Sequence, residues 1–106
     1  MRIALPTNDR KTLAVRSGQA KEFVIYEIID SEIKSVNYFE NKHEHHDHDE
    51  DYHNHSHGEI VTILKDVDLL IMSKVGKHLK ADIISAGINY KIVKIKNIDN
   101  VLSEFL

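Results

Sequence analysis

The segment from His43 to His57 concentrates the side chains best suited to metal chemistry. It holds seven of the eight histidines of this 106-residue chain, interleaved with carboxylates. In an extended chain, residues two apart point the same way, so the segment presents pairs and one triplet of imidazoles on common sides. We call this segment the histidine tract and expect it to bind a transition metal ion. The predicted ligands are His43, His45, His46, His48, His53, His55, His57, Asp47 and Asp49.

The chemistry of imidazole limits the kinds of metal expected. Neutral imidazole with carboxylate suits zinc, nickel, cobalt, copper or iron, and the carboxylates can complete the coordination sphere. Because free histidine has a pKa near 6.5, most of the rings are neutral at pH 7 and acid should release the metal. His57 precedes a predicted helix, whose N-terminus disfavours ring protonation, so it is the ligand best tied to the folded domain. The alternative is that this polar loop, residues 41–57, is simply solvated.

Catalysis by such a metal is a weaker interpretation. A zinc hydrolase needs three fixed ligands and a base, as in H-E-x-x-H on a helix, and His43-Glu44-His45-His46 lacks that spacing. We therefore expect a non-enzymatic binding protein. The remaining alternative is a protein-interaction module with an incidental histidine tract, whose partner docks on a predicted edge strand at residues 32–40 or on a helical face.

Composition limits the cellular compartment and the classes of partner that we expect. The chain has no cysteine, which excludes disulfides and thiolate-held metal sites and fits a reducing compartment. No apolar run approaches the roughly 20 residues that span a bilayer, and the N-terminus lacks the apolar core of a signal peptide, so we expect a cytoplasmic protein that does not bind membranes. The formal charge is −3, and five acids lie in the tract, so the remainder carries two more basic than acidic side chains. This small excess forms no basic stripe, so nucleic-acid binding is not expected.

The apolar pattern predicts one α/β domain spanning residues 1–106. Strands are expected at residues 2–6, 22–29 and 32–40, the last two joined as a hairpin by a tight turn at Asp30-Ser31. After the tract, the pattern predicts a helix with Ile60, Ile63, Leu64 and Val67 on one face, followed by a strand at 68–72. A second helix, with Val75, Leu79 and Ile83 on one face, is expected to end at Gly87. A strand at 88–95 and a helix capped by Asn97 come last. The order β-β-β-α-β-α-β-α predicts a mixed sheet with helices on its faces.

Several short motifs, taken in order, carry a resemblance to a known family. They are Arg2 to Thr7, Gly18-x-Ala20, the run Phe23 to Asp30, a histidine-containing stretch ending in His57-Gly58, and Ala86-Gly87-Ile88. Together they resemble the dinitrogenase iron–molybdenum cofactor biosynthesis family over nearly the whole chain. The resemblance implies a ribonuclease H-like fold, binding or carriage of iron–molybdenum cofactor or iron–sulfur precursors, and a cofactor-assembly or acceptor protein as partner.

The resemblance also implies a cofactor-binding position. It would involve Arg16, Gly18, Gly76 and His78, with positive charge from Arg16, Lys74 and Lys77 offered to an anionic cluster. Here Arg16-Ser17-Gly18 stands where the family commonly shows His-Phe-Gly, and the glycine-rich turn after the fourth strand is reduced to residues 73–77. The alternative is that these cations and His78 are ordinary solvated surface residues. A nuclease site is not expected, because the first strand carries no acid and Asp66 and Asp68 alone make no two-metal site.

Overall fold

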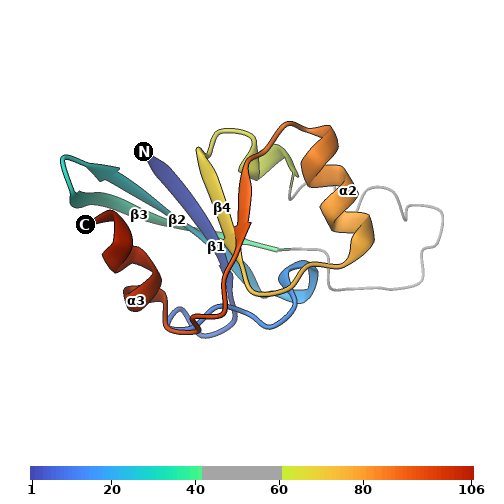
Figure 1. The fold of residues 1–106 in the computed structure, drawn as a ribbon, viewed down its shortest axis with the longest axis horizontal. Coiled ribbons are helices and arrows are strands. Elements are labelled where there is room, and N and C mark those ends of the chain that lie inside the picture. Colours follow the sequence, from blue (N-terminus) through green and yellow to red (C-terminus); the bar gives the residue numbers. More distant parts are fainter. Residues whose placement is uncertain (42–60) are drawn as a thin grey trace.

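The structure is a computed structural model that describes residues 1–41 and 61–106 (Figure 1). The histidine tract and all of its predicted ligands lie outside the described residues. The strands are β1 (Arg2–Thr7), β2 (Glu22–Ile29), β3 (Glu32–Glu40), β4 (Leu69–Met72) and β5 (Tyr90–Ile92). The helical elements are η1 (Ser17–Gln19), α2 (Lys77–Ser85), α3 (Ile98–Leu102) and η4 (Ser103–Phe105), and residues 61–64 are also helical.

The five strands form one mixed sheet in the order β3-β2-β1-β4-β5. β1 pairs antiparallel with β2 and parallel with β4, and β4 pairs parallel with β5. This arrangement confirms the predicted single α/β domain with a mixed sheet, and it is the ribonuclease H-like topology that the family resemblance implies.

Helices cover both faces of the sheet, so the domain has three layers (Figure 1). On one face, the helix at residues 61–64 and α2 bury Leu64, Leu79 and Ile83 against alternate side chains of the sheet. On the other face, α3 buries Ile98, Val101 and Leu102 against the intervening side chains. Since β1 and β2 supply apolar residues to both clusters, these strands are apolar on both faces, as a sheet covered on two sides requires.

The turns agree with their sequence signals. Asp30 and Ser31 both adopt positive φ, of 55° and 65°, as a two-residue hairpin turn requires. Gly87 follows α2 at φ 75°, in the left-handed region where glycine carries no steric penalty. Asn97 caps α3 by accepting the backbone N–H of Asn100 at 3.2 Å. These three predictions are confirmed.

The last strand is shorter than predicted. The alternation of residues 88–95 predicted a strand over that whole range, but β5 covers only Tyr90–Ile92. The neighbouring strand β4 ends at Met72, which pairs with Ile92, so residues beyond 93 have no strand to pair with on that side. The chain instead turns toward the first loop, where the N–H of Leu13 donates to the carbonyl of Lys96.

The helix boundaries differ in a smaller way. Val75 was predicted on the helical face with Leu79 and Ile83, but α2 begins only at Lys77 and Val75 lies in the preceding loop.

No helix in the described ranges is long and apolar enough to cross a membrane.

Two isoleucines of β2 provide a matched test of this core. Ile25 is 1% exposed and Ile29 is 45% exposed. Ile25→Ala should lower the free energy of unfolding by about 2–5 kcal/mol because it leaves a cavity, whereas Ile29→Ala should cost less than about 1 kcal/mol. Denaturant unfolding measures both values. Equal losses would contradict the assignment of Ile25 to the core.

Candidate functional site

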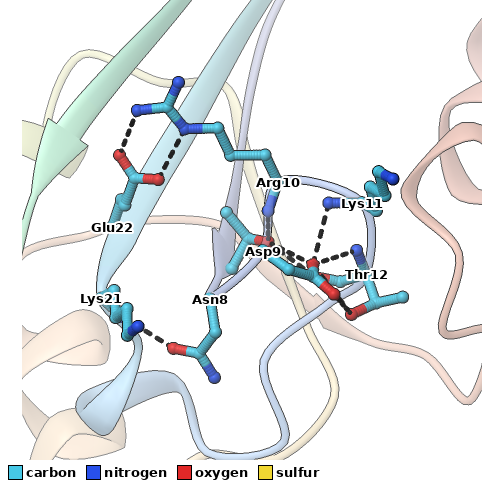
Figure 2. Close-up of polar contacts among 8 residues, drawn as sticks. Asn8, Asp9, Arg10, Lys11, Thr12, Lys21 and Glu22 are labelled. Atoms are coloured by element: carbon cyan, nitrogen blue, oxygen red, sulfur yellow. Dashed lines mark hydrogen bonds and ion pairs between the residues drawn. The ribbon is translucent and has the colours of Figure 1, made fainter.

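The loop after β1 is held by the carboxylate of Asp9 (Figure 2). Its Oδ1 accepts the backbone N–H groups of Lys11 at 2.9 Å and Thr12 at 2.8 Å, and the hydroxyl of Thr12 donates to both carboxylate oxygens. These bonds, first those from the two backbone N–H groups, lower the pKa of Asp9 to about 2. The loop is therefore built around an ionised side chain.

Arg10 fixes the same loop to the sheet. Its guanidinium makes two hydrogen bonds to Glu22, at 2.8 and 2.9 Å, which lower the pKa of Glu22 (Figure 2). The guanidinium also lies 3.9 Å from the ring centroid of Tyr38 on β3. Asn8, at the start of the loop, accepts the backbone N–H of Lys21, at its end, so the two ends of the loop are joined.

The middle of the loop is joined to the loop between β4 and α2 through one carbonyl. Ser17, which is fully buried, donates both its N–H, at 3.1 Å, and its hydroxyl, at 2.7 Å, to the carbonyl oxygen of Lys74. Asn41 is also buried, and its side-chain amide donates to the carbonyls of Gly18 and Ala20. These contacts set the position of Arg16 and Gly18 relative to Lys74.

Between these two loops and the first turn of α2 lies a cavity of about 330 Å³, which we call the α2 pocket. This volume is within the range of small-ligand sites. The lining residues are Arg16, Gly18, Gln19, Lys74, Val75, Gly76, Lys77, His78 and Leu79. All four residues of the predicted cofactor-binding position, Arg16, Gly18, Gly76 and His78, thus line one cavity, together with the two lysines named as charge donors.

The α2 pocket is electropositive. Arg16, Lys74 and Lys77 contribute three positive charges, and no carboxylate is among the described residues that line the cavity. The first turn of α2 adds to this, because a helix N-terminus carries a partial positive charge and unpaired N–H groups. Gly76 occupies the N-cap and has no side-chain oxygen that could accept hydrogen bonds from these N–H groups. A Cβ at Gly76 would meet no atom of the described residues within 4 Å.

Some contributors to the site gave no signal in the sequence. Ser17 and Asn41 hold the loops by contacts over 57 and 23 residues of sequence, respectively, and neither stands in a recognisable motif. Within residues 1–41 and 61–106, no group of three histidine, aspartate or glutamate side chains is placed to hold a metal ion. Asp68, considered for a nuclease site, accepts the backbone N–H of Arg2 at 2.7 Å and so has a structural contact.

The fold and the α2 pocket together define a class: a small three-layer α/β domain with a cationic cavity beside a helix N-terminus. The family model described as "Dinitrogenase iron-molybdenum cofactor" matches residues 1–106. The chain therefore belongs to this family, as the sequence motifs indicated. A comparison with curated proteins gives no match.

Solved structures support the fold assignment. A candidate dinitrogenase from Methanocaldococcus jannaschii is similar with a TM-score of 0.70 and 22% identity, covering 99% of this chain and 86% of that one. A candidate NifB protein from Thermotoga has a TM-score of 0.67 and 23% identity, with 98% and 85% covered. The apo orange protein from Desulfovibrio gigas has a TM-score of 0.69 and 17% identity, with 98% and 85% covered. At these identities the likeness concerns the fold.

The Asp9 network makes a prediction about pH. Because the folded-state pKa of Asp9 is about 2, below its ordinary value of 3.8, its stabilising effect is complete above about pH 4 and is lost as the pH falls through about 2. Asp9→Asn keeps one acceptor oxygen and removes the charge. The variant should have a lower denaturation midpoint than the wild type at pH 7, and the gap should close between pH 4 and pH 2.

Asp66→Asn, which changes an exposed aspartate away from this loop, is the matched control and should show no such closing gap. A constant difference between Asp9→Asn and wild type from pH 7 to pH 2 would show that the charge of Asp9 does not stabilise the loop.

Proposed function

We propose that this protein is a non-enzymatic carrier or accessory factor that holds an anionic metallocluster in the α2 pocket, as part of iron–molybdenum or iron–sulfur cofactor assembly. The observation that carries the proposal is the lining of the cavity, whose described residues include three cations and no carboxylate, in a member of the iron–molybdenum cofactor family. The cluster is cargo, received from or passed to a cofactor-assembly or acceptor protein.

The side chains present fit cargo better than a permanently held group. The chain has no cysteine, so it offers no thiolate to iron. His78 supplies one imidazole, and the family resemblance implies that Arg16 stands where a histidine is common. A cluster that brings its own sulfides would therefore be held mainly by charge and by N–H donors. Contacts of this kind allow release.

The exposure of the cations supports the same view. Arg16, Lys74, Lys77 and His78 are all exposed, so the pocket opens toward solvent. Charge pairs between exposed groups are screened by salt over about 8–10 Å at physiological ionic strength. We therefore expect binding that weakens as salt rises, which suits transfer between proteins.

Gly76 allows a test in which stability and binding change in opposite directions. Gly76→Asp places a carboxylate at the N-cap of α2, where it should stabilise the helix by a few tenths of a kcal/mol. The same carboxylate lies on the pocket lining and should weaken binding of isolated iron–molybdenum cofactor by about tenfold or more. Anaerobic gel filtration, with molybdenum and iron measured in the protein fraction, gives the retained cluster.

Gly76→Asn is the matched control, because it supplies a neutral capping oxygen of similar size. It should bind the cofactor within a few-fold of wild type. Unchanged retention by Gly76→Asp, with its thermal midpoint at or above that of wild type, would exclude the α2 pocket as the binding site.

We also propose that the histidine tract binds a transition metal ion, separately from the α2 pocket. The support is compositional: seven histidines and several carboxylates within residues 43–57 of a chain that has no thiol. Tracts rich in histidine bind metal readily and need no packed structure to do so. The predicted ligands remain His43, His45, His46, His48, His53, His55 and His57, with Asp47 and Asp49.

Deletion of the tract separates this second role from the first. Isothermal titration of the intact chain with Zn²⁺, Ni²⁺, Co²⁺ and Cu²⁺ should show binding at pH 7.5 and little at pH 5, because protonated imidazole is no ligand. A chain with residues 43–57 replaced by a glycine–serine linker should lose this binding and keep cluster retention in the α2 pocket. Equal metal binding by both chains would remove the tract from the proposed function.

A further inference from the structure

The lining of the α2 pocket is charged where it is exposed and apolar where it is buried. The three cations, Arg16, Lys74 and Lys77, are long side chains that remain exposed. Leu79, in contrast, is 3% exposed and belongs to the core under α2, and the half-buried Val75 packs against that core. A ligand that fills the pocket therefore meets cations on its outer side and hydrocarbon on its inner side.

Gly18 contributes to the buried side from the opposite loop. A Cβ at Gly18 would lie 3.6 Å from Cδ2 of Leu79, so this position faces the leucine side chain. Two carbonyl groups of the lining are already engaged, because that of Gly18 accepts the side-chain amide of Asn41 and that of Lys74 accepts two hydrogen bonds from Ser17. We call Gly18, Val75 and Leu79 the apolar wall, since their side chains offer a ligand no hydrogen bond.

An apolar wall distinguishes anions by how strongly they hold water. An oxyanion accepts strong hydrogen bonds from water, and hydrocarbon gives it nothing in exchange for the water that is displaced. Sulfur is more polarisable and a weaker acceptor, so a sulfide group loses less on leaving water and gains more dispersion contact. The exposed cations attract both kinds of anion alike when the charge is the same. The difference between the two kinds therefore arises at the wall.

We infer that the α2 pocket selects sulfide-bearing anions over oxyanions of the same charge and shape, and that Val75 and Leu79 determine this selectivity. The inference rests on the proposed function and narrows it, because it names the chemical class of the surface that the cargo presents. The cavity of about 330 Å³ is roughly ten times the volume that one water occupies in the liquid, so size excludes neither kind of small anion.

The first turn of α2 acts in the opposite direction. Its unpaired N–H groups donate more strongly to oxygen than to sulfur. They belong to exposed residues, Lys77 and His78, where water competes for the same hydrogen bonds, so their net preference for an oxyanion is small. The wall is buried and excludes water, and its effect is therefore the larger one.

Tetrathiomolybdate and molybdate test this selectivity directly. The two anions share the metal, the charge and the tetrahedral shape, and they differ only in sulfur for oxygen. Isothermal titration of the full chain, anaerobically at pH 7.5 and after treatment with a chelator to remove metal from the histidine tract, gives both dissociation constants. Tetrathiomolybdate should bind about tenfold or more tightly than molybdate.

Val75→Thr tests the apolar wall, because threonine has nearly the shape of valine and adds one hydroxyl. The hydroxyl offers an oxyanion a hydrogen bond, so the preference for tetrathiomolybdate should fall several-fold. Val61→Thr is the matched control. Val61 is also half-buried and packs against the same core, but it is not among the residues that line the pocket. This variant should keep the wild-type preference, with a thermal midpoint close to that of Val75→Thr.

Gly76→Asp locates the two anions in the α2 pocket. Its carboxylate would lie on the pocket lining and repel both anions alike. Both dissociation constants should therefore rise, and their ratio should stay at the wild-type value. The charge variant and the wall variant thus change different quantities, the affinity and the selectivity.

A wild-type preference for tetrathiomolybdate that Val75→Thr narrows and Val61→Thr keeps supports the inference. Equal or reversed affinities in the wild type, binding of neither anion at millimolar concentration, the same preference in the two threonine variants, or no effect of Gly76→Asp on either anion would overturn it. Retention of isolated iron–molybdenum cofactor without this preference would reject the selectivity alone. The preference without cofactor retention would support the selectivity and reject the proposed carrier role.

Discussion

The structure depends on β1 lying at the centre of the sheet between an antiparallel and a parallel neighbour. Ile3, Ala4 and Leu5 are fully buried, and they alternate between the two core clusters. Because β1 is hydrogen-bonded to a strand on each edge and packed against a core cluster on each face, the chain that follows it passes over the carboxyl ends of β1 and β4. The loop of residues 8–21 therefore meets the loop between β4 and α2, and this is where the α2 pocket forms.

At that meeting point the carbonyl oxygen of Lys74 accepts two hydrogen bonds from Ser17. A carbonyl has two lone pairs, and a buried serine that satisfies both removes the cost of an unpaired polar group in the junction. The consequence for the site is geometric. Arg16 and Gly18 flank Ser17, and Lys74 supplies the acceptor, so one short contact sets the spacing between cations that are 58 residues apart in sequence. The repulsion among these like charges is tolerated because their side chains remain exposed.

Much of the fold could be predicted from the sequence because its signals are local. Alternation and apolar runs marked β2 and β3, the turn at Asp30-Ser31 is a property of two residues, and Asn97 and Gly87 carry the capping chemistry of their helices. The length of β5 could not be predicted, because a strand ends where its neighbour ends and that depends on β4. The four residues Arg16, Gly18, Gly76 and His78 came from the family resemblance, and their common cavity required the fold. Ser17 and Asn41 act through contacts between distant segments, which no local pattern records.

The charge distribution connects the two proposed roles of the chain. The described cavity concentrates cations, while the acids of residues 43–57 and their imidazoles stand in a segment that follows directly on Asn41. A cationic cavity attracts an anionic cluster and repels a free divalent metal ion, and an acidic imidazole segment does the opposite. Since one polypeptide holds both kinds of donor and has no thiol, the two proposed roles require that selectivity between ion and cluster come from charge. Asn41, buried and bonded to Gly18 and Ala20, is the last described residue before that segment and is itself fixed to the loop that lines the cavity.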